Sequence, residues 1–278
     1  MKFVDAHVHL SDPQYAGHTD MLVYDAQNSG TVALVTNAMN YATSVEALKL
    51  KAKNPDLIHV ALGIHPWNVN DLKEGELANT LNLINQEHSK SSIIAIGEIG
   101  LDCKYEAVWN QQLLVFDKML RQAEKLNLPV IIHSRGTTEF IVDMLPSYNL
   151  KRVLLHWFSH PMPALYKAIE NGYYITEGPP AVYSPGIREV ITNTPLTNLM
   201  TETDGPVLFR KPPFNGQMTR PSFIREVVQA ISQIKNIPAQ TVSEQIAENF
   251  EKFFNVKLTE QKNSSRDIPQ KLNMEEQG

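Results

Sequence analysis

The chain has 278 residues, of which 42% are hydrophobic and 20% charged, and its formal net charge is −5. This composition can form a substantial core, and the negative charge argues against a protein that coats duplex nucleic acid through excess lysine and arginine. The single cysteine, Cys103, excludes an intramolecular disulfide, and no stretch approaches the roughly 20 apolar residues that span a bilayer. We therefore expect a cytoplasmic protein with no membrane segment, and a monomer as its favoured state.

Short apolar or β-branched runs alternate along the chain with segments of helical periodicity. The longest helical segment carries Leu113, Phe116, Leu120, Ala123 and Leu126 at spacings of three and four, which predicts one apolar face. Strands are predicted at residues 2–8, 31–37, 57–64, 92–98, 128–133, 152–156, 172–176 and 198–204. Helices are predicted at residues 45–53, 76–88, 106–127, 140–148, 163–172, 221–235 and 241–254.

This alternation indicates parallel βαβ units in an α/β protein. Eight strands favour a closed (β/α)8 barrel of the TIM type, as a single domain over residues 1–256, and a doubly wound open sheet is the alternative. The last segment, residues 259–278, is polar and lacks periodicity, which predicts a disordered tail.

Metal-capable side chains recur where the predicted strands end. Side chains alternate along a strand, so the two histidines of FVDAHVHL share one face. In a barrel the C-terminal strand ends converge, which would bring side chains from distant positions together. The candidate metal ligands are His7, His9, Glu98, His133, His156 and Asp204.

This set suits a pair of divalent ions, because a carboxylate can bridge two cations and imidazoles suit Zn, Mn or Fe better than Mg. Glu98 is the candidate bridge. We expect His7, His9 and Asp204 to complete the site of one ion, and the histidines of the fifth and sixth strands to complete the other. Two such ions can clamp the attacking and leaving oxygens of an in-line displacement.

The motifs FVDAHVHL, LGIHPW, IGEIGLD, LPVIIHSR, LHWFSH and ETDGP resemble, in their order, those of the TatD family of metal-dependent deoxyribonucleases, which have amidohydrolase-type barrels. The resemblance runs from residue 1 to about residue 256. It implies a (β/α)8 barrel, two divalent ions, and hydrolysis of phosphodiesters, typically as a 3′→5′ exonuclease on single-stranded DNA. It also implies metal binding by the six residues above and places His65 near the substrate phosphate.

The chain departs from the family pattern at positions close to the proposed ligands. HWFSH carries Trp157 and His160 where the family usually has cysteine and glycine, and Cys103 and Lys104 precede the tyrosine that commonly follows the GLD motif, here Tyr105. None of these departures replaces a proposed metal ligand, but all of them could change how the substrate is bound. The metal site is therefore the safer prediction.

Other residues have both a functional and a structural interpretation. Arg135 could bind phosphate through two hydrogen bonds, or could form a structural ion pair. Asp102 could orient a metal ligand, or could lie in a solvated loop. Trp67 and Trp157 could stack on bases, or could pack over the barrel mouth. We count His65, Arg135 and Tyr105 as the candidate substrate-binding residues.

The sequence thus predicts a metal-dependent phosphodiester hydrolase, specifically a 3′→5′ exodeoxyribonuclease on single-stranded DNA or another nucleic acid. Its water would be activated by two divalent ions (Mg, Mn or Zn), with Glu98 and Asp204 as the catalytic residues and Asp204 as the group that positions or deprotonates the water. One alternative is a barrel hydrolase acting on a small ester, lactone or amide. Another is a binding subunit for nucleic acid or a protein partner, without turnover.

Overall fold

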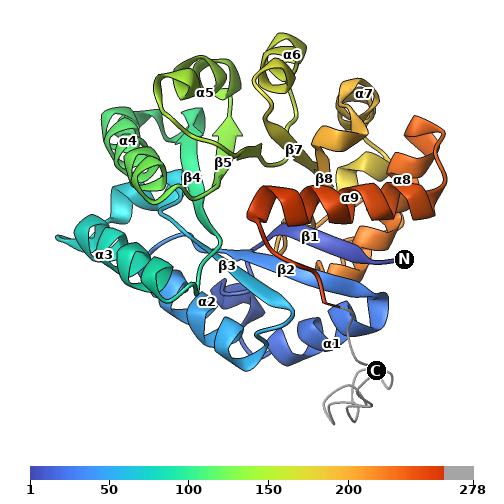
Figure 1. Cartoon of the computed structure of the whole chain (residues 1–278), viewed down its shortest axis with the longest axis horizontal. Helices are drawn as coiled ribbons and strands as arrows, with labels where there is room; N and C mark the ends of the chain where they lie inside the picture. The colour runs from blue at the N-terminus through green and yellow to red at the C-terminus, as the bar shows by residue number, and fades with distance from the viewer. Residues whose placement is uncertain (260–278) are drawn as a thin grey trace.

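A computed structural model describes residues 1–259 and shows an eight-stranded parallel sheet that curves into a barrel (Figure 1). The strands are hydrogen-bonded in sequence order, which confirms the predicted (β/α)8 architecture. Of the predicted tail, residues 260–278 lie outside the described part of the chain. The strands are β1 (Phe3–Val8), β2 (Thr31–Asn37), β3 (Ile58–Leu62), β4 (Ala95–Asp102), β5 (Val130–Arg135), β6 (Val153–Leu155), β7 (Tyr174–Glu177) and β8 (Leu199–Thr201).

Hydrogen bonds between β1 and the segment around β8 close the barrel. The Thr201 hydroxyl donates to the Val4 carbonyl at 2.7 Å, and the Asp204 amide donates to the His7 carbonyl at 2.9 Å. The His9 amide in turn donates to the carbonyl of Gly205 at 2.8 Å. These contacts exclude the open-sheet alternative.

Helices surround the barrel, and two of them were not predicted. Helix α1 has only a weakly apolar face around Leu22 and Ala26, and α7 begins with Pro185 and Gly186. Proline suits the first turn of a helix although both residues weaken a helical sequence pattern. Within residues 1–259 the helices are α1 (Thr19–Ser29), α2 (Tyr41–Lys53), α3 (Glu76–Ser89), α4 (Trp109–Leu126), α5 (Thr138–Met144), α6 (Met162–Glu170), α7 (Pro185–Asn193), α8 (Ile224–Lys235) and α9 (Ala239–Phe254).

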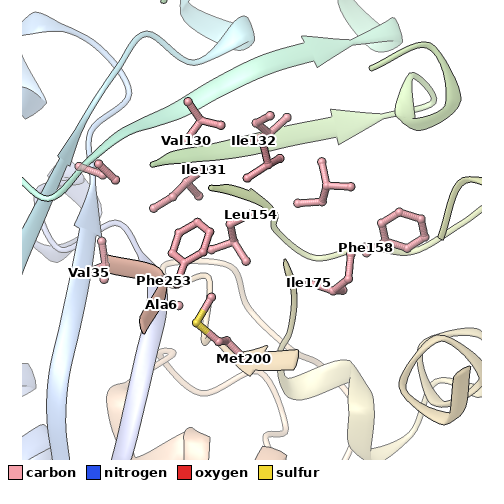
Figure 2. Close-up of a cluster of buried hydrophobic side chains, with 14 of the residues drawn as sticks. Ala6, Val35, Val130, Ile131, Ile132, Leu154, Phe158, Ile175, Met200 and Phe253 are labelled. Atoms are coloured by element: carbon pink, nitrogen blue, oxygen red, sulfur yellow. The ribbon is translucent and has the colours of Figure 1, made fainter. Parts of the chain in front are cut away.

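The last helix covers one end of the barrel (Figure 1). Figure 2 shows Phe253 of α9 inside the buried apolar cluster that also contains Ile131, Leu154 and Met200. The Arg152 guanidinium, just before β6, donates to the Phe253 carbonyl at 3.0 Å, so α9 lies at the N-terminal ends of the strands. Helix α9 therefore does not cover the opposite end of the barrel, where the C-terminal ends of the strands lie. No helix among residues 1–259 combines the length and apolar character needed to cross a bilayer.

Strand β4 differs most from its prediction. It runs past Glu98 to Asp102, so Glu98 lies within the strand and not at its end. The continuation is buried, and it depends on Gly100, whose φ of +152° favours glycine. A Cβ at Gly100 would lie 2.0 Å from the His133 carbonyl oxygen, so glycine lets β4 and β5 approach closely there. Asp204, predicted as the end of the eighth strand, lies in the loop three residues beyond Thr201.

Candidate metal centre

A pocket of about 880 Å³ opens at the C-terminal ends of the strands. Five of the six candidate metal ligands line it, and the sixth, His7, is fully buried beside them. Side chains separated by up to about two hundred residues in the sequence therefore meet at one place. The lining candidates are His9, Glu98, His133, His156 and Asp204, together with His65 and Arg135.

The Glu98 carboxylate, almost completely buried, lies at the centre of five imidazoles. Its two oxygens divide them: three ring nitrogens contact Oε1 and two contact Oε2. The distances to Oε1 are 2.8 Å for His156, 3.0 Å for His133 and 3.2 Å for His65, and those to Oε2 are 3.1 Å for His9 and 3.2 Å for His7. Glu98 thus has the position of a bridge between two sets of ligands.

Among residues 1–259, three groups of side chains bring their donor atoms within 4.8 Å of one another, as ligands of a cation would. The first is the predicted group of His7, His9 and Asp204. His133 and His156, which the sequence assigns to one ion, both contact Oε1 of Glu98 but belong to different groups. The other two groups are His7, Glu98 and His156, and His65, Glu98 and His133.

The distances within the first group fit a metal ion. The Nε2 atoms of His7 and His9 lie 3.1 Å apart, close to the separation of two nitrogens that are each about 2.1 Å from one tetrahedral ion. The Asp204 Oδ1 atom lies 3.4 Å and 3.5 Å from the same two nitrogens. Nitrogen and oxygen donors in this proportion suit Zn, Mn or Fe.

The electrostatics of the cluster also fit a cation. Burial lowers the pKa of His7 and brings that of His65 to about 4, which leaves both rings neutral, the form that binds metal. Burial opposes a charge on His9 too, but the carboxylates of Asp204 and Glu98 outweigh it and raise the pKa of His9 to about 10. The proton on His9 thus provides a positive charge between two carboxylates, and a bound metal ion would provide that charge instead.

The pKa values of the carboxylates agree with this interpretation. Burial raises the pKa of a carboxyl group, yet the surrounding imidazoles hold the pKa of Glu98 well below its usual range. A hydrogen bond from His9 and the nearby imidazoles likewise outweigh burial and lower the pKa of Asp204. Both side chains are therefore ionised and available as ligands or bases at neutral pH.

Asp102 orients His133 from outside the cluster. Its side chain is buried, which excludes the solvated-loop alternative. Its Oδ2 accepts the His133 Nε2–H at 3.0 Å and the Trp67 Nε1–H at 2.5 Å, and its Oδ1 accepts the Lys104 amide at 2.9 Å. These hydrogen bonds outweigh burial and lower the pKa of Asp102 to about 2. Burial opposes a charge on His133, but Asp102 and Glu98 outweigh it and raise the pKa of the ring. With Nε2–H bonded to Asp102, the Nδ1 atom, 3.0 Å from Glu98, is the nitrogen that would bind a metal in place of a proton.

Further acidic side chains lie inside the barrel below the cluster. Burial raises the pKa of Asp5 to about 8, and its carboxyl group is bonded to Thr203. Glu202 Oε2 lies 3.6 Å from the Nδ1 atom of His156. Burial and the adjacent Glu202 also raise the pKa of Glu177 well above its usual range. The sequence prediction missed Glu177, although an acidic residue directly after a predicted strand was a usable signal.

Of the three predicted substrate-binding residues, two line the pocket and one does not. Arg135 is exposed at the pocket wall, and its guanidinium forms no hydrogen bond or ion pair with any residue of the described range, contrary to the structural-pair alternative. His65 lines the pocket but also belongs to the ligand cluster. Tyr105 lies outside the pocket lining, in the 3-10 helix Cys103–Val108, with its ring centroid 6.1 Å from that of Trp67.

Comparisons with known proteins show the family to which the chain belongs. A family model described as TatD related DNase matches residues 4–255. An uncharacterized metal-dependent hydrolase of Methanocaldococcus jannaschii is 29% identical over 93% of this chain and 99% of its own length. The human deoxyribonuclease TATDN3 is also 29% identical, over 90% of this chain and 94% of its own length.

Two further comparisons extend over similar lengths. The 3′-5′ ssDNA/RNA exonuclease TatD of Erwinia tasmaniensis is 28% identical over 91% of this chain and 99% of its own length. The crystal structure of YjjV, a TatD homolog from Escherichia coli K12, has a TM-score of 0.83 and 27% identity, over 92% of this chain and 98% of that chain. Since the family model covers nearly the whole chain, the protein belongs to the TatD-related DNase family and is a metal-dependent hydrolase.

Proposed function

We propose that the protein is a 3′→5′ exonuclease that hydrolyses the phosphodiester bonds of single-stranded DNA with two divalent metal ions. The observation that carries this proposal is the Glu98 carboxylate, which has imidazoles on both oxygens in an arrangement suited to bridging two ions. Two relatives support the substrate class, because one is named a deoxyribonuclease and another a 3′-5′ ssDNA/RNA exonuclease.

The ligand groups would divide between the ions on the two sides of Glu98. His7, His9 and Asp204 would hold one ion. His133 and His156, which both contact Oε1 of Glu98, would hold the other, with His65 on the same oxygen and close enough to contribute a donor. Bound there, the ions would supply Lewis-acid stabilisation of the phosphoryl group and make a water molecule more acidic.

The chain's own residues account for the remaining chemistry. Asp204, ionised at neutral pH and facing the pocket, can accept the proton of a water whose oxygen forms a bond to phosphorus. The bond from phosphorus to the 3′ oxygen of the shortened strand breaks, and that oxygen takes up a proton. Arg135, with no protein partner within residues 1–259, can donate to the non-bridging phosphate oxygens.

The direct test is degradation of an end-labelled single-stranded oligonucleotide after chelation and addition of Mg, Mn or Zn. We expect stepwise shortening from the 3′ end, which should be absent in His133→Ala and Asp204→Asn proteins that fold normally. If folded, metal-loaded protein shortens no oligonucleotide but turns over an aryl ester, the proposal is wrong and the small-ester alternative is supported.

The role of Arg135 has its own test and a matched control. Arg135→Met should raise KM for the oligonucleotide by about tenfold or more, because a charge-assisted hydrogen bond contributes about 1.5–3 kcal/mol. Arg121→Met is the control, because Arg121 is an exposed arginine of α4 that pairs with Asp117 outside the pocket. Equal KM values for the two variants would contradict phosphate binding by Arg135.

A further inference from the structure

We propose that Trp67 forms a stacking surface for the terminal nucleobase of the strand and so contributes to substrate selection. This inference rests on the proposed function and adds a base-binding subsite to it. Trp67 lies in the 3-10 helix Pro66–Asp71, in the loop that follows β3, and its side chain lines the pocket.

The indole is held in a fixed position. Its Nε1–H donates to the buried Asp102 carboxylate at 2.5 Å, and the Trp67 backbone amide donates to Nδ1 of His65 at 3.1 Å. The ring of Tyr105 lies beside it at 6.1 Å and 39°. An aromatic ring fixed in this way loses little conformational entropy when a ligand stacks on it.

A purely structural role does not explain this placement. Trp67 is 38% exposed although its polar edge is fully bonded, so a large apolar surface remains in contact with water. Burying this surface under a planar ligand would be favourable. Tryptophan is enriched at binding surfaces because its ring offers a large apolar face while its N–H group is hydrogen-bonded.

Trp67 lies directly beside the side chains of the metal centre. The ring centroid of Trp67 lies 4.8 Å from that of His65 and 6.0 Å from that of His133, and both histidines contact Glu98. A phosphodiester held at this centre would therefore have the base of its own nucleotide within reach of the indole.

The rest of the pocket wall also suits a base. Val207 and Leu208 line it and are 37% and 52% exposed, which adds apolar surface. Arg135 is the one lysine or arginine among the described lining residues, so the side chains offer a strand little positive charge beyond the metal centre. Stacking of bases on aromatic side chains is a sequence-tolerant source of affinity. We therefore expect recognition of a terminal base of any identity, with purines favoured by their larger faces.

The test combines two variants with two substrates. Trp67→Leu and Trp67→Phe both lose the hydrogen bond to Asp102, but only phenylalanine keeps an aromatic face. Each protein, with its metal content measured, is assayed on oligonucleotides that end at the 3′ side in deoxyadenosine or in an abasic nucleotide. Any effect through Asp102 and His133 should be common to both variants, so the ratio of rates on the two substrates isolates stacking.

Wild-type protein should cleave the deoxyadenosine end with a kcat/KM about five- to thirtyfold above that for the abasic end, mainly through KM. Trp67→Phe should retain most of this ratio, and Trp67→Leu should reduce it to near one. If wild type cleaves both ends equally, or if Trp67→Leu keeps the ratio, the base subsite is refuted while the exonuclease proposal stands. If metal-loaded wild type cleaves no oligonucleotide, both are refuted.

Discussion

Replacing Asp102 with asparagine should weaken metal binding without removing a ligand. The carboxylate accepts three N–H groups, from Lys104 on one oxygen and from Trp67 and His133 on the other. An asparagine side chain has a single oxygen acceptor. Either the Lys104 amide or the pair of N–H groups from Trp67 and His133 must therefore lose its acceptor. If His133 loses it, the ring is no longer held with Nδ1 toward Glu98.

The size of the effect follows from what such a partner usually contributes. The hydrogen bonds lower the pKa of Asp102 to about 2, so the charged carboxylate is the form that His133 contacts. Removing the partner of a ligating histidine commonly costs about 10- to 100-fold in metal affinity. We therefore expect Asp102→Asn to reduce metal affinity and kcat/KM at limiting metal by about thirtyfold.

The measurement is competition for the metal against a chromophoric chelator, together with kcat/KM as a function of free metal. Asp117→Asn is the matched control: Asp117 accepts hydrogen bonds from Arg121 and Tyr148, and its pKa is also lowered, but it lies on α4 outside the pocket. Metal affinity of Asp102→Asn within twofold of the Asp117→Asn value would refute the positioning role.

Three further outcomes are expected. Gly100→Ala should destabilise the fold by about 3 kcal/mol or more, measured by denaturant unfolding, because its Cβ would clash with the backbone of His133; an unchanged midpoint would contradict this. Chelation should abolish hydrolysis and lower Tm, and metal should restore both, since a ligand at 100 times its Kd adds about 2.7 kcal/mol; a Tm independent of metal would oppose a structural contribution. Burial lowers the pKa of His59 to about 4 in the folded protein, so the unfolded chain binds its proton first as pH falls. Stability is therefore highest above pH 6.5 and falls by about 3 kcal/mol in all as the pH decreases through 4. The difference in unfolding free energy between wild type and His59→Gln, measured at pH 7 and pH 4.5, should reveal most of this loss.

The sequence predicted the barrel and the convergence of the metal-capable residues because both depend on local patterns. Eight short apolar runs separated by helical periodicity specify the βαβ repeat, and a histidine such as His156 directly after a run is visible without coordinates. Helix α7 was missed because Pro185 and Gly186 weaken its pattern, while tertiary packing of Ile187, Val190 and Ile191 stabilises it.

The grouping of the ligands could not be predicted in the same way. Which histidines share an oxygen of Glu98 depends on how far β4 extends and how it is staggered against β5, and a register shift between Ile96 and Ile99 changes that stagger. The loop after β3 also folds back, so that His65 reaches Glu98 instead of only facing substrate. Neither feature has a periodic signature in the sequence.

The metal ligands and the residues of the pocket wall come from different parts of the fold, and this separation has a functional consequence. The cluster is built mainly from strands and strand ends that buried hydrogen bonds hold in register, whereas Trp67, Val207 and Leu208 lie in loops at the pocket wall. Substitutions in those loops can alter which substrate is bound while hydrolysis is retained. Trp67 is the exception within the wall, because its hydrogen bond to Asp102 links it to His133. A change there should therefore affect base recognition and, through Asp102, the metal centre as well.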